Sequence, residues 1–223
     1  IIHPLEQMKS PREIRVSPFY TKQKNMEAVF FESAGWERPQ WYDINKSLLS
    51  YEDDQYPNRS GWEALNWSRV IFAEHRSTRK RAGLFDLTPF TKLEISGEGA
   101  LEFLQHMCAN DINRPIGTII YTSMLNNRGG VQCDLTVTRL DTQQFFVVTS
   151  SVFGLHDRLW MERHCPNDDS VSISDLTSNY SCIGLWGPHA RKILQNTTEH
   201  DISNKTFPYM TAQTIEIGSI PVL

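Results

Sequence analysis

The carboxylate of Asp134, which follows a double-glycine turn, is a side chain that could do acid–base chemistry. Gly129-Gly130 separates two runs of strand-forming residues, and Asp134 comes four residues after the second glycine. Glycine permits positive φ and close backbone approach, so this turn lets two adjacent strands present side chains to a flat ligand. A carboxylate held there could accept or remove a proton from a ligand N–H group. Asp134 is therefore a candidate for acid–base chemistry, and the alternative from the sequence alone is a strand-edge carboxylate that is merely solvated.

Other common catalytic motifs have no match in the sequence. No G-x-S-x-G, H-E-x-x-H or G-x-x-x-x-G-K occurs, and Gly129-Gly130 lacks the glycine spacing of a dinucleotide fingerprint. His156 and Asp157 are adjacent, but without a serine or cysteine motif to activate they indicate a helix surface. The four cysteines form no C-x-x-C and the histidines show no ligand spacing, so we predict no metal site.

Composition and charge are those of an ordinary globular protein. The 223 residues are 39% apolar and 22% charged, with a formal net charge of −4. The longest basic block is Arg79-Lys80-Arg81, so we expect no nucleic-acid partner. No apolar run approaches the ~18 residues of a membrane span, and no signal segment opens the chain. The cysteine pattern is typical of reduced thiols in an intracellular compartment.

Two segments of different character must position the candidate residues. Residues 1–78 are rich in Trp, Tyr and Pro with little periodicity, which is typical of a connector laid over a neighbouring domain. We expect helices there only at about 21–33 and 63–81. Residues 79–223 alternate between strand and helix patterns, which indicates an α+β fold with mixed sheets and packed helices.

Within residues 79–223, periodicity and turn residues define the individual elements. Strands are predicted near 90–96, 118–125, 131–140, 144–149, 171–175, 181–186 and 211–217. Helices are predicted near 100–107, 152–164 and 188–195. The chain then stops within an apolar segment, residues 220–223, for which we expect no pairing partner.

Two motifs together carry a resemblance to a known family. The first comprises residues 121–126 (YTSMLN), 129–131 (GGV) and 134–137 (DLTV), with supporting matches at 85–88 (FDLT) and 185–188 (LWGP). It resembles the folate-site hairpin of the glycine-cleavage aminomethyltransferase fold.

The second motif is spread over the connector. It comprises residues 10–12 (SPR), 17–20 (SPFY) and 35–41 (GWERPQW). This run is similar to the central segment that joins the flavin domain to the folate domain in sarcosine and dimethylglycine dehydrogenases. The resemblance implies a connector at 1–78, followed at 79–223 by an aminomethyltransferase-type folate-binding domain that is incomplete at its C-terminus.

The resemblance also implies an activity for the full-length protein. In this family FAD, bound by an N-terminal domain missing here, oxidises an N-methyl amine to an iminium. Tetrahydrofolate then captures the one-carbon unit as 5,10-methylenetetrahydrofolate. The implied partners are a small methylated amine, folate and an electron-transfer flavoprotein. The implied location is the mitochondrial matrix, with the cytoplasm as the alternative, and the fragment alone is expected to be inactive.

The resemblance assigns roles to four residues. Asp134 matches an aspartate beside the folate nitrogens that assists carbon transfer, and Tyr121 matches an aromatic residue lining the folate site. Thr136 and Phe90 fall at positions of the same pocket, although their residue types differ from those of relatives. Many relatives carry a second aspartate where this chain has Cys133, so the resemblance implies no carboxylate pair here.

Two alternatives share parts of this pattern. The regulatory subunit of mitochondrial pyruvate dehydrogenase phosphatase has the same layout and is a non-catalytic, protein-binding component. A stand-alone aminomethyltransferase acts on a lipoyl carrier protein. The regular run from Gly129 to Val137 favours the dehydrogenase over the first alternative, and the segment at residues 10–42 argues against the second.

Overall fold

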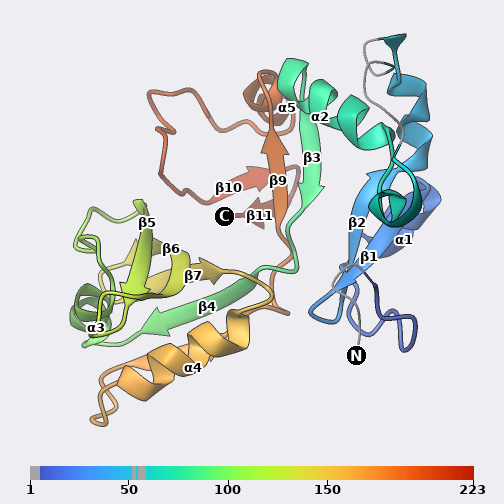
Figure 1. Ribbon diagram of the computed structural model, residues 1–223. Helices are drawn as coiled ribbons and strands as arrows, with labels where there is room; N and C mark the ends of the chain where they lie inside the picture. Colours follow the sequence, from blue (N-terminus) through green and yellow to red (C-terminus); the bar gives the residue numbers. More distant parts are fainter. Residues whose placement is uncertain (1–5, 52–53, 55–58) are drawn as a thin grey trace. The chain divides into compact units, whose positions relative to one another are not determined.

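The computed structural model describes residues 6–51, 54 and 59–223, and the chain divides into two compact units (Figure 1). Unit 1 comprises residues 1–89 and 181–190, and unit 2 comprises residues 90–180 and 191–223. The chain therefore leaves unit 1, builds most of unit 2, and returns to unit 1 for ten residues before it completes unit 2. The division predicted at residue 78 stays a prediction.

Unit 1 begins with a short helix and a hairpin. Helix α1 (Tyr20–Asn25) is followed by strands β1 (Ala28–Ser33) and β2 (Trp36–Tyr42), which pair antiparallel. The helix predicted over 21–33 is therefore wrong beyond residue 25. Glu27 adopts a left-handed φ of 57° that ends the helical turn, and Val29 then pairs with Trp41. Branched and aromatic side chains gain more from cross-strand packing than from a continued helix.

The rest of unit 1 holds short helices and a second strand pair. The 3₁₀ helices η1 (Asp43–Leu48) and η3 (Gly61–Ala64) precede α2 (Val70–Lys80). The helix predicted over 63–81 thus begins later, because Asn66 has a φ of 58° that an α-helix cannot include. Strand β3 (Gly83–Asp86), which the sequence pattern did not predict, pairs antiparallel with β9 (Ile183–Trp186).

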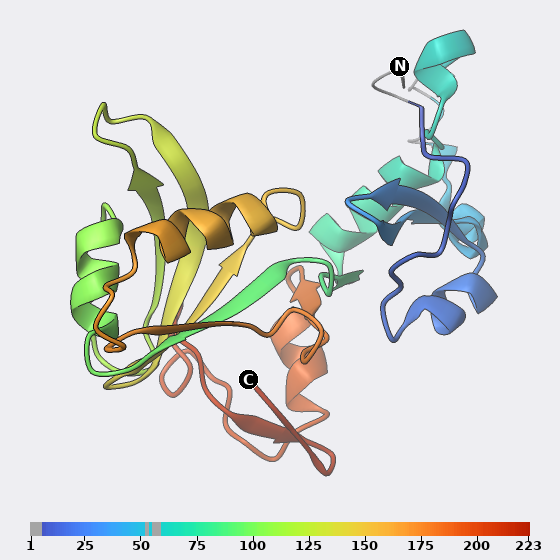
Figure 2. The same ribbon diagram turned by 90° about the horizontal axis from the view of Figure 1, so that it is seen from below.

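Unit 2 is built on a five-stranded sheet with the order β5-β6-β7-β4-β8. All neighbouring strands are antiparallel, and they confirm the predicted α+β class. The strands are β4 (Thr91–Ser96), β5 (Ile119–Leu125), β6 (Val131–Asp141), β7 (Gln144–Thr149) and β8 (Ser172–Asp175). Helices α3 (Ala100–Met107) and α4 (Gly154–His164) pack on one face of this sheet (Figure 2).

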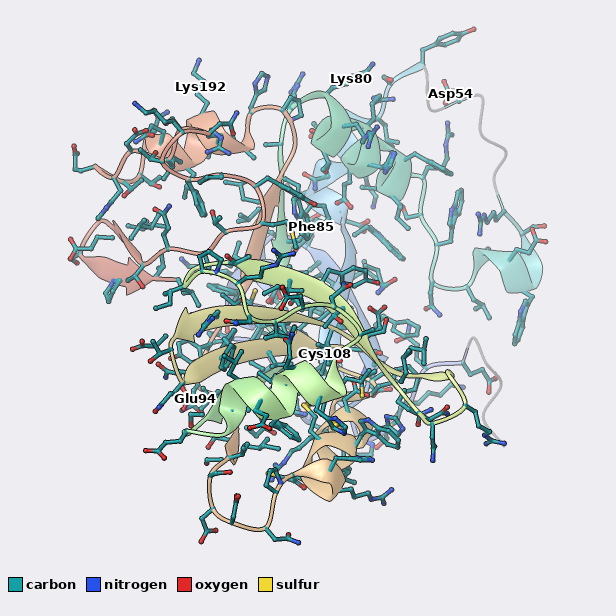
Figure 3. All side chains as sticks on the ribbon, turned by 90° about the vertical axis from the view of Figure 1, so that its left-hand side faces the viewer. Asp54, Lys80, Phe85, Glu94, Cys108 and Lys192 are labelled. Atoms are coloured by element: carbon teal, nitrogen blue, oxygen red, sulfur yellow. The ribbon has the colours of Figure 1, made fainter. Side chains whose placement is uncertain are left out.

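The core of unit 2 lies between the sheet and these two helices. Alternate strand residues point into it, as the period-two pattern predicts. Cys108, labelled in Figure 3, lies at the end of α3 in the same core. Helix α4 approaches the sheet closely because Gly154 has no side chain; an added β-carbon would lie 1.9 Å from Thr91 Oγ1. Fully buried core side chains include Leu93, Ile95, Leu104, Met124, Val137, Phe145, Val147 and Met161.

The last part of unit 2 ends in a hairpin. Helix α5 (Ala190–Gln195) is followed by β10 (Ile215–Ile217) and β11 (Ile220–Val222), which pair antiparallel. The expectation that residues 220–223 have no partner is therefore wrong. Gly218 adopts a φ of 62°, which lets the chain reverse within two residues and brings the apolar end onto β10. Among the described residues, no helix is both long and apolar enough to cross a bilayer.

Candidate functional site

The double-glycine turn between β5 and β6 is held by a single asparagine. The Oδ1 atom of Asn126 accepts hydrogen bonds from the backbone N–H of Arg128 at 3.0 Å and of Gly130 at 2.9 Å. Gly129 takes the left-handed φ of 76° that the turn requires. These contacts fix the turn, and the turn fixes which residues of β5 and β6 face one another.

The hairpin brings three of the four predicted site residues onto one face of the sheet. Tyr121 of β5 lies directly opposite Thr136 of β6, and Asp134 lies opposite Ser123, one pair nearer the turn on the same face. Asp134 is exposed, Thr136 is half-buried, and Tyr121 is 60% exposed. The alternate residues of β6, such as Leu135, point into the helix-covered core. The predicted juxtaposition is present, and the sheet face is exposed around Tyr121 and Asp134.

Phe90, the fourth predicted residue, belongs to the same face. Thr91 of β4 pairs with Thr149 of β7, and Thr149 pairs in turn with Leu135 of β6. Continuing this register by one residue places half-buried Phe90 in the row of Asp134, two strands away. With a strand spacing of about 4.8 Å, their backbones stand about 10 Å apart.

Electrostatically, the site is defined by the contact between Tyr121 and Asp134. The hydrogen bond of the phenol to the Asp134 carboxylate raises the pKa of Tyr121, and the negative charge of Asp134 adds to the effect. The tyrosine therefore keeps its proton to a higher pH than a free tyrosine. It offers an O–H donor beside a carboxylate acceptor.

This coupling gives a direct test of the geometry. In the Asp134→Ala variant, we expect the pKa of Tyr121 to fall back toward the ordinary tyrosine value, because both the acceptor and the charge are gone. NMR titration of ¹³C-labelled tyrosine in alkaline buffer measures this, with Tyr121→Phe assigning the signal. Thr136→Val, which removes a neutral hydroxyl from the same face, is the control. A Tyr121 titration unmoved by Asp134→Ala would contradict the contact.

Lys92 is a residue of this face that sequence reasoning missed. It pairs with Val148, which pairs with Thr136, so these residues continue one row across the sheet. Its side chain is 2% exposed, and its Nζ donates to the carbonyl oxygen of Phe90 at 2.8 Å. The only sequence feature that could have indicated this residue is a lysine within a strand-like run. Lysine side chains at such positions are usually solvated, so the burial of Lys92 was not predicted. Its contact holds the backbone of Phe90 in place.

On the helix-covered face of the sheet, the position of Asp157 differs from the prediction. His156 and Asp157 of α4 were expected to lie together on the helix surface. The His156 side chain is 51% exposed, but that of Asp157 is 4% exposed and points toward the sheet. The residues at 154, 157 and 161 form the buried stripe of α4, and this spacing places the carboxylate inside.

A family model and several known proteins match this chain. The model described as the GCVT N-terminal domain matches residues 19–223. Rat mitochondrial dimethylglycine dehydrogenase is 33% identical over 209 residues, which are 93% of this chain and 23% of that protein. The mouse mitochondrial pyruvate dehydrogenase phosphatase regulatory subunit is 29% identical over 210 residues, again 93% of this chain and 23% of the relative. The chain thus spans about a quarter of the length of these relatives.

A solved structure shares the fold. The crystal structure of glycine cleavage system aminomethyltransferase T from Bartonella henselae matches with a TM-score of 0.66 at 25% identity. The match covers 83% of this chain and 44% of that protein.

Proposed function

Because the chain belongs to the GCVT N-terminal domain family, we propose that the open face of its five-stranded sheet is part of a tetrahydrofolate site. One observation carries this proposal. Asp134, Tyr121, Thr136 and Phe90 come from three strands or strand ends and share one face. A carboxylate, a phenol and a second aromatic ring provide acceptor, donor and stacking surfaces, as a reduced pterin requires.

In this proposal each residue has a separate task. Bound tetrahydrofolate supplies the nucleophilic nitrogen that takes up a one-carbon unit. Asp134 accepts the proton that this nitrogen loses, or holds the N–H group in line for attack. Tyr121 keeps its proton and orients the Asp134 carboxylate. Phe90 offers an aromatic ring at the β4 end of the row that contains Asp134. The backbone of Phe90 is held by the hydrogen bond from Lys92.

The chain forms one wall of the proposed pocket. Tyr121 is 60% exposed and Asp134 is exposed, so this face offers contacts from one side. The chain spans 44% of the matched aminomethyltransferase structure. We propose that other parts of the full-length protein supply the opposite wall. The 223-residue chain by itself then binds folate weakly and transfers no carbon.

For the full-length protein, we propose a flavin-dependent N-methyl amine dehydrogenase of the sarcosine or dimethylglycine type, located in mitochondria. The likeness to dimethylglycine dehydrogenase over 93% of this chain supports this assignment. FAD is bound outside these residues, and an electron-transfer flavoprotein is the proposed acceptor. The likeness to the phosphatase regulatory subunit over an equal share of the chain makes a non-catalytic regulator the second candidate.

One experiment separates the two candidates. We expect the purified full-length protein to contain flavin and to oxidise sarcosine or dimethylglycine in the presence of an artificial electron acceptor. With tetrahydrofolate the product should shift from free formaldehyde to 5,10-methylenetetrahydrofolate, which chromatography distinguishes. Absence of amine oxidation, together with co-purification of the phosphatase catalytic subunit, would reject the dehydrogenase and favour the regulator.

A further inference from the structure

A second polar cluster lies on the opposite, helix-covered side of the sheet. Cys133 of β6 is 2% exposed and belongs to the core, and Asp157 of α4 is also buried. His156, at the solvent side of the same helix, is exposed. Since neighbouring residues of a strand point to opposite faces, Cys133 faces away from the proposed folate site while Asp134 faces toward it. The proposed folate chemistry makes no use of this cluster.

The donor atoms of the cluster converge on one point. Asp157 Oδ1 lies 3.0 Å from Nδ1 of His156, and its Oδ2 accepts a hydrogen bond from the hydroxyl of Thr149. The Cys133 sulfur, the His156 ring nitrogen and an Asp157 carboxylate oxygen all lie within 4.8 Å of one another. They come from a strand and a helix far apart in the sequence, so no local spacing motif reveals them.

We propose that Cys133, His156 and Asp157 form a binding site for a divalent cation of the zinc class. Sulfur, imidazole nitrogen and carboxylate oxygen are the ligand types that Zn²⁺ and Co²⁺ select, whereas Mg²⁺ and Ca²⁺ select oxygen alone. Three protein ligands leave a fourth position, which a water molecule can fill. Thr149, by donating to the other carboxylate oxygen, fixes the orientation of Asp157.

Binding requires small movements and the release of one proton. Ligand atoms around tetrahedral zinc stand about 3.3–3.7 Å apart. His156 Nδ1 and Asp157 Oδ1, now 3.0 Å apart, must therefore separate slightly, and ligand atoms nearer the 4.8 Å limit must approach one another. Without metal, burial raises the pKa of Cys133 to about 12, and the charge of Asp157 adds to this, so the sulfur carries its proton. The bound cation takes the place of that proton, which passes to water. The ion would join β6 to α4.

Cobalt titration of the metal-free 223-residue chain tests the site. We expect Co²⁺ to give a sulfur-to-cobalt charge-transfer band and tetrahedral visible bands that saturate at one ion per chain, and Zn²⁺ to abolish them. Cys133→Ala should lose the charge-transfer band. His156→Gln, which changes a half-exposed side chain and leaves the buried ligands in place, should weaken Co²⁺ binding at least about tenfold.

The control is the half-buried Cys165, which lies in the loop after α4 and outside the cluster. Cys165→Ala should keep the wild-type cobalt spectrum. Zn²⁺ at one fixed concentration should raise the Tm of the wild type by about 5–10 °C and that of His156→Gln by clearly less, because the variant binds the ion more weakly. The proposal is overturned if the wild type gives no sulfur-to-cobalt band, or if the band survives in Cys133→Ala. Neither readout depends on folate.

Discussion

Replacement of Asp134 by asparagine should slow tetrahydrofolate-dependent capture of the one-carbon unit by about 10²–10⁴-fold in the full-length protein. Asparagine keeps the shape of the side chain but cannot accept a proton as a carboxylate does. Oxidation of the amine, which takes place at a flavin outside these residues in our proposal, should keep its wild-type rate. The variant should therefore release formaldehyde even with tetrahydrofolate present.

The measurement is the ratio of 5,10-methylenetetrahydrofolate to formaldehyde in single-turnover and steady-state reactions. Asp169→Asn is the matched control, because Asp169 is an exposed aspartate in the loop between α4 and β8. Its φ of 59° suits asparagine well, so this control changes a charge without straining the chain. Wild-type methylene transfer in Asp134→Asn would remove the base assignment while leaving folate binding open to a separate titration.

Phe145→Ala should reduce the free energy of unfolding by about 3–5 kcal/mol. Phe145 is 0% exposed, lies on β7 in the interior of the sheet, and is the largest of the fully buried side chains. Its removal leaves a cavity that the surrounding strands and helices cannot fill. Urea unfolding of the 223-residue chain, followed by circular dichroism, measures the loss.

The adjacent phenylalanine provides the matched control. Phe146 points to the other face, is half-buried, and meets the ring of Tyr180 edge-on at 5.8 Å between centroids. Phe146→Ala should reduce the free energy of unfolding by only about 1–2 kcal/mol, because less apolar surface returns to water. Equal losses in the two variants would mean that the assignment of the two sheet faces is mistaken.

Much of unit 2 could be predicted from its sequence because its strands alternate with period two. At Val29 and Phe30 the same reasoning predicted a helix where the structure has a strand. A run of three or four apolar residues fits a short helix and a strand equally well. Their partner strand decided the outcome, and pairing between segments is not visible in local spacing. The C-terminal hairpin was missed for a related reason: a strand of three residues has almost no periodicity to read.

The candidate site shows the same division between local and distant information. That Asp134, Tyr121 and Thr136 share a face follows from a turn flanked by alternating strands, so the sequence was sufficient for these residues. The burial of Lys92 and Asp157 could not be predicted from the sequence, because it depends on segments from elsewhere in the chain that pack against them. A charged residue type predicts exposure, and only tertiary packing overrules it.

The pairing of β3 with β9 has a consequence for how the protein is made. The ribosome releases Gly83–Asp86 nearly a hundred residues before Ile183–Trp186, so the first strand waits without its neighbour while the sheet of the second unit emerges. The five-stranded sheet of the second unit is complete once Asp175 has emerged, and it can form early on its own contacts. The pair of β3 and β9 forms only after Trp186 has emerged, so a shorter synthesis product would carry an uncovered β3 edge prone to association.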